Sequence, residues 1–151
     1  MAATLPNTIP RAANTNTTFN KSSAQIDIIA EDSPPNIGAG SVSEMALLEA
    51  KNKDGKFYFL TRYGHKPHTS FDYSDNTRNI YLVFGKESTG IPKEILKDHL
   101  NECARIPINS NIRALNLSNC VALVLFEALR QQDYPNLLRT EPFKGEDYLE
   151  N

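Results

Sequence analysis

The most constraining feature of this chain is the stretch 80–132, where two strand-like runs each end in a polar loop. The first run, Ile80–Phe84, is apolar throughout and stops at Gly85, before the sequence KESTGIP. A run without polar alternation is typical of a strand that is covered on both faces, as in the parallel sheets of α/β proteins. The second run, residues 104–108, leads into NSNIRALNLSN. Because parallel strands end at one edge of a sheet, the two loops predict a ligand site there.

Other patterns place further elements around these two strands. Residues 25–30 and 56–61 are rich in β-branched and aromatic side chains, which predicts two more strands. Pro92 suits a first helical position and predicts a short helix over 93–99. Apolar residues at helical spacing predict a long amphipathic helix over 117–132, with Asn116 or Ser118 as its N-cap. Strands that alternate with helices indicate an α/β fold with a mostly parallel sheet flanked by helices.

The remaining segments carry little pattern. Residues 1–24 are rich in Ala, Asn, Thr, Ser and Pro, and predict a loop or a disordered arm. Residues 42–50 predict a short helix at best, and the polar stretch 62–78 predicts a loop. We expect one domain over residues 1–138, followed by a polar, mostly acidic tail over 139–151 for which the sequence indicates no function.

Composition indicates the cellular compartment of the protein more clearly than its function. The net charge of −2 gives no nucleic-acid signal, so an RNA ligand would need a local basic patch. Cys103 and Cys120 do not form a CxxC pair, and their apolar contexts favour buried free thiols in a reducing compartment. The longest apolar run, residues 121–126, is far too short to span a bilayer, and the N-terminus lacks the pattern of a secretory signal. We therefore expect a cytoplasmic protein.

Two of these segments also carry a family resemblance. GKESTGIP resembles the G-x-E-x-x-G-x-P loop of the SPOUT methyltransferases, and IRALNLSNCVALVLFEALRQ resembles their S-x-N-L-S-x-x-V-A helix start. The resemblance extends from about residue 56 to residue 137 and is closest to the small TrmL (YibK-like) group. It implies a C-terminal deep trefoil knot, the SPOUT or α/β-knot fold, with the loops around Gly85, Ile106 and Leu115 forming the knot.

The same resemblance implies an activity and its partners. Members of this group transfer a methyl group from S-adenosyl-L-methionine to the ribose 2′-oxygen of nucleotide 34, a cytidine or uridine, in the tRNA anticodon loop. They are homodimers with the site at the subunit interface. We therefore expect an S-adenosylmethionine-dependent tRNA (cytidine/uridine-34) 2′-O-methyltransferase that acts as a homodimer.

The resemblance also implies which residues form the site. The resemblance implies that the cofactor is bound by Leu60, Gly85, Glu87, Gly90, Ile106, Ala114, Leu115 and Asn116. It implies catalytic roles for Arg11, Glu87, Asn116 and Ser118, with Arg11 assisting removal of the 2′-hydroxyl proton. From the residues alone, Leu60 and Ile106 would be core, Gly85 either a turn glycine or a point of close ligand approach, and Glu87 a solvated carboxylate.

The chain departs from the family pattern in two places. Ala114 stands where the family usually has serine, so one hydroxyl is lost. Asn7 and Arg11 are four residues apart instead of six, and the intervening glycine is missing. Residues 1–50 are shorter than the N-terminal half of the family and diverge from it.

Basic residues gather in and around the predicted loops, with Tyr63 and Tyr73 among them. They are Arg62, His65, Lys66, His68, Lys86, Lys93, Arg105 and Arg113. Such a set suits phosphate contacts and base stacking on a single-stranded RNA loop, and an ordinary charged surface is an equally good interpretation. His65 and His68 lack metal-ligand partners at a useful spacing, so we expect no metal.

Three alternative functions stay open from the sequence. The first is a SPOUT enzyme that acts on another RNA position. The second is a catalytically weakened, RNA-binding dimer of the same fold, which the altered N-terminal segment and Ala114 favour. The third is an α/β domain without a cofactor.

Overall fold

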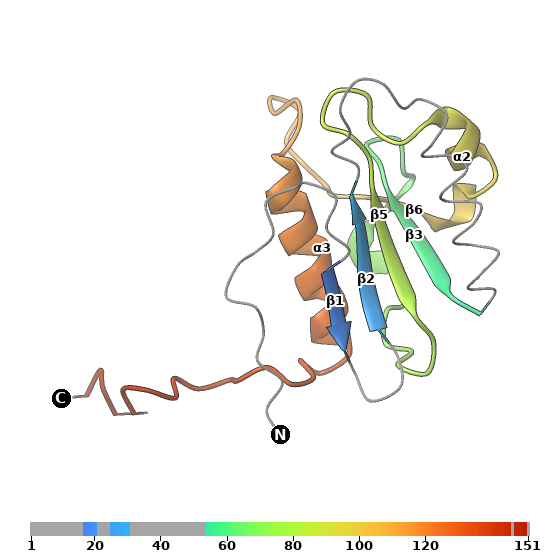
Figure 1. Cartoon of the computed structure of the whole chain (residues 1–151). Helices are drawn as coiled ribbons and strands as arrows, with labels where there is room; N and C mark the ends of the chain where they lie inside the picture. Colours follow the sequence, from blue (N-terminus) through green and yellow to red (C-terminus); the bar gives the residue numbers. More distant parts are fainter. Residues whose placement is uncertain (1–16, 21–24, 31–53, 146, 151) are drawn as a thin grey trace.

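The fold is a six-stranded sheet with helices on both faces (Figure 1). The computed structural model describes residues 17–20, 25–30, 54–145 and 147–150. The strands are β1 (Thr17–Asn20), β2 (Gln25–Ala30), β3 (Lys56–Leu60), β4 (Lys66–Pro67), β5 (Ile80–Phe84) and β6 (Cys103–Arg105). The helices are α2 (Lys93–Lys97) and α3 (Leu117–Gln131), with 3-10 turns η1 (His68–Ser70) and η2 (Leu100–Glu102).

The sheet is mostly parallel, as the sequence predicts. The strand order is β1-β2-β5-β3-β6-β4, and among these strands only β1 pairs in the antiparallel direction, with β2. Strands β2, β5 and β3 are in register, so that Ile28 and Tyr58 flank Leu82 on either side. The carboxyl ends of β3, β5 and β6 therefore meet at the same edge of the sheet.

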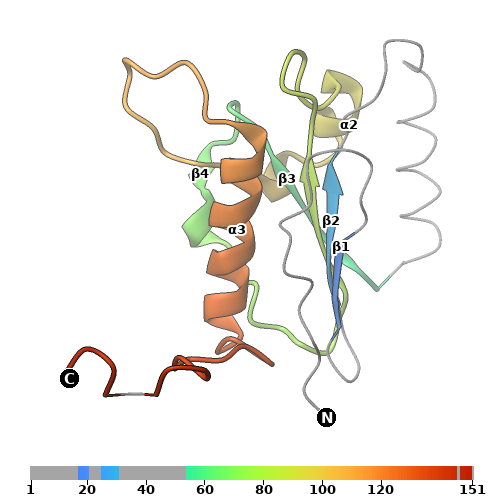
Figure 2. The same cartoon turned by 60° about the vertical axis from the view of Figure 1, so that its left-hand side comes forward.

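Strand β5 is the centre of two hydrophobic cores. Ile80, Leu82 and Phe84 face α3, where they pack with the α3 residues Leu117, Val124, Leu125, Ala128 and Leu129. Val83 faces the opposite layer and packs with Phe59 and with α2. Figure 2 shows α3 and α2 on opposite sides of the sheet. All five residues of β5 are buried, which confirms that its continuous apolar run marks a strand covered on both faces.

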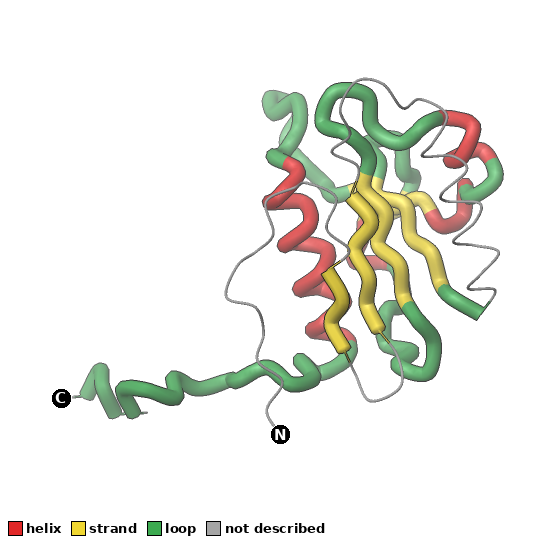
Figure 3. Tube along the Cα trace, in the orientation of Figure 1, coloured by secondary structure: helices red, strands yellow, loops and turns green. Residues whose placement is uncertain are grey.

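Helix α3 has the predicted helical period, and it ends one residue before the end of the predicted range 117–132. The helix runs along one face of the sheet (Figure 3), and its buried positions Leu117, Val124, Leu125, Ala128 and Leu129 pack on that face. The chain then takes positive φ at Asp133 and Tyr134, directly before Pro135, so the helix ends close to where the sequence predicts. Beyond this point the C-terminal segment runs away from the body of the molecule (Figure 1).

Several predictions of local structure were wrong. Part of the expected arm at 1–24 is the edge strand β1, which gains its backbone partners from β2. The expected loop at 62–78 contains β4 and η1, and the strand expected at 104–108 covers Cys103–Arg105 instead. Pro107 lacks an N–H for a ladder hydrogen bond, so pairing stops before it. The expected helix at 42–50 lies outside the described residues.

Tyr73 is a core residue and does not present its ring to a nucleic acid. Its side chain is fully buried, and its hydroxyl donates to the carbonyl oxygen of His68 at 2.7 Å. Burial raises the pKa of this phenol. The interpretation of Tyr73 as a base-stacking aromatic was therefore wrong, because its ring fills the space between α3 and Tyr58.

The last turn of α3 holds the backbone around Tyr73 in place. Gln131 Oε1 accepts from the Tyr73 N–H at 2.7 Å, and Gln131 Nε2 donates to the Phe71 carbonyl at 2.9 Å. Gln132 Nε2 donates to the Tyr73 carbonyl at 2.7 Å. Glu127 Oε1 accepts a further bond from Gln131 Nε2 at 2.9 Å, which fixes the orientation of that amide. Two neighbouring glutamines thus pair three backbone groups of a distant loop.

The carboxylate of Glu127 predicts a pH dependence of stability. Hydrogen bonds from Arg130, and then from Gln131, lower the pKa of Glu127 from its ordinary 4.5 to about 2. A lowered folded-state pKa contributes stability above pH 4.5 that is lost as the pH falls toward 2. We expect Glu127→Gln to cost roughly 1 kcal/mol at pH 7, below the range of about 1.5–3 kcal/mol for hydrogen bonds to charged groups, because the Arg130 side chain is 58% exposed and solvent screens the pair.

Urea unfolding of both proteins from pH 7 to pH 3 measures this effect. The difference in unfolding free energy between wild type and Glu127→Gln should shrink as the pH falls below about 4.5. A constant difference across this range would show that the carboxylate charge is not involved.

Candidate functional site

A cleft of about 670 Å³ lies at the sheet edge where β3, β5 and β6 end. Three segments surround it: residues 60–63, 84–91 and 105–117. In Figure 1 the loop after β5 and the loop before α3 stand together at this edge. The volume falls within the roughly 300–1,000 Å³ range typical of small-molecule pockets. A cavity is therefore present where the two strand-to-loop junctions predict a ligand site.

The structure brings together most of the predicted site residues. All eight proposed cofactor residues line the cleft: Leu60, Gly85, Glu87, Gly90, Ile106, Ala114, Leu115 and Asn116. Leu60 and Ile106 also pack against the α3 core, as expected from the residues alone. Ser118 is not among the lining residues, and Arg11 lies outside the described residues. The roles of these residues toward a ligand stay predictions.

Glu87 connects the loop after β5 to the start of α3. Its Oε1 accepts a hydrogen bond from the backbone N–H of Leu117 at 3.3 Å. Leu117 is the first residue of α3, where unpaired N–H groups carry partial positive charge and favour a carboxylate. Glu87 is exposed, as expected for a loop carboxylate, and this hydrogen bond also joins the two predicted motifs.

Asn116 is the N-cap of α3. Its Oδ1 accepts from the backbone N–H of Ser118 at 2.8 Å, which settles the choice between the two predicted caps. The helix therefore uses the carbonyl end of this amide. Its NH₂ end is the part of the side chain that can donate to a ligand.

Gly85 is required by the shape of its own loop. A Cβ at this position would lie 2.1 Å from the carbonyl carbon of Gly90 and 2.2 Å from the nitrogen of Ile91. The interpretation of Gly85 as a turn glycine is therefore supported, and a close approach of a ligand to its backbone from the cleft stays a prediction. Gly90 has open space around it but a φ of +69°, and its N–H donates to the Lys86 carbonyl at 2.8 Å. The two glycines shape one tight loop by different means.

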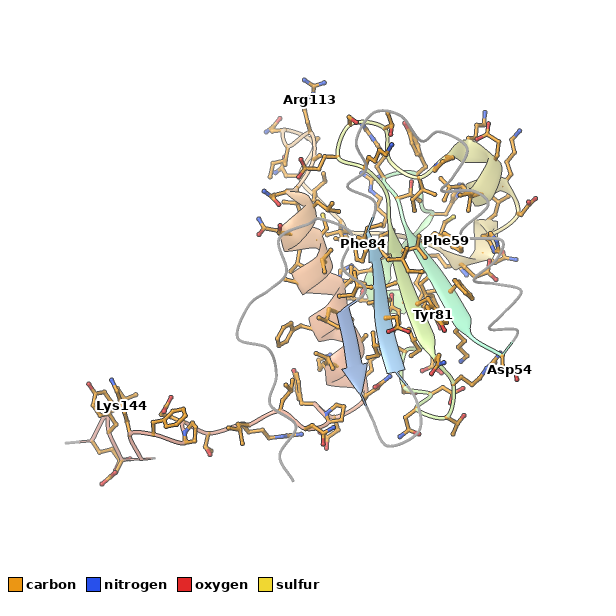
Figure 4. All side chains as sticks on the ribbon, in the orientation of Figure 1. Asp54, Phe59, Tyr81, Phe84, Arg113 and Lys144 are labelled. Atoms are coloured by element: carbon orange, nitrogen blue, oxygen red, sulfur yellow. The ribbon has the colours of Figure 1, made fainter. Side chains whose placement is uncertain are left out.

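The cleft is positively charged. Four of the eight predicted basic residues line it, and they are Arg62, Lys86, Arg105 and Arg113; the only acidic lining residue in the described part of the chain is Glu87. Figure 4 shows Arg113 reaching outward from the loop before α3. His65, Lys66, His68 and Lys93 do not line the cleft. The structure therefore concentrates basic charge at this edge although the whole chain has a net charge of −2.

One lining residue that the sequence analysis assigned to the core is Cys120. Its thiol is half-buried, and burial, followed by the charge of Glu87, raises its pKa. Cys103 and Cys120 are both free thiols, as predicted. Because Cys120 follows Asn116 by one helical turn, the helical period could have placed it on the same face.

Comparison with known proteins identifies the family. The SpoU rRNA Methylase family model matches residues 13–126, well over half of the chain. The chain belongs to the SpoU methylase family. The SPOUT resemblance of the two motifs is thereby confirmed.

Individual relatives agree with this family. A protein of Bacillus subtilis (strain 168) is 47% identical over 91 residues, 60% of this chain, and its name, with the activity given as provisional, is tRNA (cytidine(34)-2′-O)-methyltransferase. The match covers 56% of that relative, so the chain spans about half the length of the curated relatives it matches.

Two solved structures share the fold of this SpoU-family chain. One, from Bacillus anthracis and described provisionally as an RNA methyltransferase, has a TM-score of 0.59 and 34% identity and covers 74% of this chain and 81% of its own. Another, described as "Structural insights into the 2-OH methylation of C/U34 on tRNA", has a TM-score of 0.52 and 29% identity, with coverage of 60% and 56%.

Two kinds of feature are absent from the described residues. No group of three His, Cys, Asp or Glu side chains stands close enough to hold a metal ion. None of the helices in the described ranges combines the length and apolar character needed to cross a membrane.

The two loop glycines give a matched pair of predictions. Gly85→Ala should destabilise the protein by about 1–3 kcal/mol or more, because backbone atoms on the opposite side of the loop would have to move. Gly90→Ala should cost about 1–2 kcal/mol, the penalty for an L-residue at positive φ without a clash. Urea unfolding measures both variants, and an equal or larger loss for Gly90→Ala would contradict the steric explanation for Gly85.

Proposed function

We propose that this chain is an S-adenosylmethionine-dependent methyltransferase that modifies the ribose 2′-oxygen of cytidine or uridine 34 in tRNA. The observation that carries the proposal is the cleft, because both SPOUT-like motifs of a SpoU-family chain meet in it. The printed names of the Bacillus subtilis relative and of the structural neighbour that concerns C/U34 support this choice of substrate.

The residues of the cleft fit an adenosyl group. Leu60, Ile106 and Leu115 offer apolar surface for a base, and the loop backbone offers N–H and C=O groups to read its edge. S-adenosylmethionine supplies a methyl group already activated by a sulfonium. The protein has to align the ribose oxygen with that methyl group and help remove a proton from a weakly acidic alcohol.

Three residues near the start of α3 would position the reactants. Glu87 is anchored to Leu117 through one oxygen and can accept a hydrogen bond through the other. Asn116 would donate through its NH₂ group, and Ser118 would contribute its hydroxyl. Ala114 has no hydroxyl, so any contact there is made by its backbone. Arg11 would assist deprotonation of the 2′-hydroxyl.

The positive cleft and one face of α3 fit the two expected partners. Arg62, Lys86, Arg105 and Arg113 surround the cleft with charge suited to RNA phosphates. On α3, Leu123 and Phe126 are 47% and 53% exposed, and a second copy of the chain would cover them in a homodimer. We place the tRNA anticodon loop at the cleft and the second subunit beside α3.

We also propose that the chain path around the cleft is a deep trefoil knot. The membership of the SpoU family and the meeting of the loops after β5 and β6 in one cleft support this topology. A crystal structure tests both the knot and the dimer. We expect residues 105–117 to pass through the loop that precedes them and α3 to face a second subunit, and an unthreaded path or a solvent-exposed α3 would contradict the respective proposal.

Cofactor binding and methyl transfer test the activity separately. We expect calorimetric titration with S-adenosylhomocysteine to show one site per chain, and no heat at millimolar ligand would refute the cofactor site. With tritiated S-adenosylmethionine, a tRNA transcript should be labelled, and a transcript carrying 2′-deoxycytidine at position 34 should not.

The two closest alternatives give different results in the same assay. Equal labelling of both transcripts would indicate that the enzyme acts on another RNA position. Cofactor and tRNA binding without any labelling would indicate an RNA-binding dimer that has lost turnover.

A further inference from the structure

Tyr63 is an aromatic side chain that the protein exposes at the mouth of the cleft. It lines the cleft, and 73% of its surface is accessible to solvent. The other cleft-lining tyrosine or phenylalanine in the described residues is Phe84, which is 2% exposed and belongs to the core. Tyr63 is therefore the ring in this part of the chain that a ligand in the cleft can reach.

The backbone under Tyr63 is fixed. The N–H of Thr61 donates to the Ala104 carbonyl at 2.9 Å, and the N–H of Gly64 donates to the Thr61 carbonyl at 3.2 Å, which closes a turn around the tyrosine. Gly64 packs so tightly on Ala104 that a Cβ would lie 2.7 Å from its carbonyl carbon. A side chain on such a turn is exposed because the turn presents it, and not because the segment is loose.

The charges around the Tyr63 ring indicate which kind of ligand the ring would contact. The Arg62 guanidinium lies 5.7 Å from the ring centroid, so one face of the ring carries a cation and the large exposed area leaves the ring open to a second planar group. Four cations and one carboxylate line the same cleft. Aromatic rings flanked by Arg and Lys are typical of sites for unpaired nucleotides, where the ring stacks on a base and the cations contact phosphates.

We propose that Tyr63 is a stacking platform for one unpaired base of the RNA, and that Arg62 supports it. The inference rests on the proposed function, because it assumes an RNA in the cleft, and it assigns a residue to RNA binding that the motif resemblance leaves out. Tyr63 acts as a positioning residue: it holds a base close to the target nucleotide and does not touch the reacting atoms.

Substitutions at Tyr63 separate stacking from other roles. The readout is the dissociation constant for a fluorescein-labelled tRNA anticodon stem-loop, measured by anisotropy with the whole 151-residue chain. Removal of the ring in Tyr63→Leu should weaken binding by roughly ten- to a hundredfold, the usual size of one base–aromatic stack. Tyr63→Phe keeps the ring and should bind within about twofold of wild type.

The chain offers a matched control on its C-terminal tail. Tyr148 is also exposed, at 57%, and carries a cation over its ring, since Lys144 Nζ lies 4.7 Å from the centroid. It does not line the cleft, and Figure 4 shows Lys144 far from the sheet. Tyr148→Leu should therefore leave RNA binding unchanged.

A fluorescent base reports the stack directly. We expect 2-aminopurine, placed in turn at each loop position next to nucleotide 34, to be quenched at one position by wild type and Tyr63→Phe but not by Tyr63→Leu. Unchanged RNA affinity in Tyr63→Leu, an equal loss in Tyr63→Phe, or an equal loss in Tyr148→Leu would overturn the proposal.

Binding of S-adenosylhomocysteine distinguishes a failure of the stacking role of Tyr63 from a failure of the proposed function. All the variants should bind it as wild type does, because the ring is exposed and Tyr63→Leu removes no buried contact. If wild type binds both S-adenosylhomocysteine and the stem-loop but Tyr63→Leu has no effect, only the stacking role fails. If wild type binds neither, the proposed function fails and the stacking role with it.

Discussion

Burial of β5 on both faces is the constraint on which the rest of the structure depends. Its side chains alternate between α3 and the opposite layer, and the strand pairs in parallel with β2 on one side and β3 on the other. This pairing places the carboxyl ends of the neighbouring strands at one edge. The loops that leave this edge then have little freedom in where they go, and the cleft forms between them.

Inside the cleft, contacts within the protein determine its shape before any ligand is considered. Gly85 permits its own loop to close, Gly90 provides the turn, and Glu87 ties that loop to the first N–H of α3. The family motif G-x-E-x-x-G therefore has a structural meaning at each of its three fixed positions. These contacts define the shape of the loop without a ligand.

Elements with a strong internal pattern could be predicted from the sequence. The continuous apolar run of β5 and the helical period of α3 identify those elements almost to the residue, and the two motifs identify the cleft. Strands β1 and β4 could not be predicted, because they are edge strands that depend on a partner and not on a pattern of their own. The core position of Tyr73 could not be predicted either, because its backbone is held by a hydrogen bond to Gln131, which is 58 residues away in the sequence.

The glutamine pair at the end of α3 has a consequence for how the molecule opens. Gln131 and Gln132 bind the backbone of residues 71–73, so fraying of the final helical turn and release of that loop become one cooperative event. Because these partners are distant in sequence, chain entropy makes their pairing costly early in folding. Amide protons of the two segments should therefore exchange with solvent as a single unit, although nothing in the sequence between them suggests that they are neighbours.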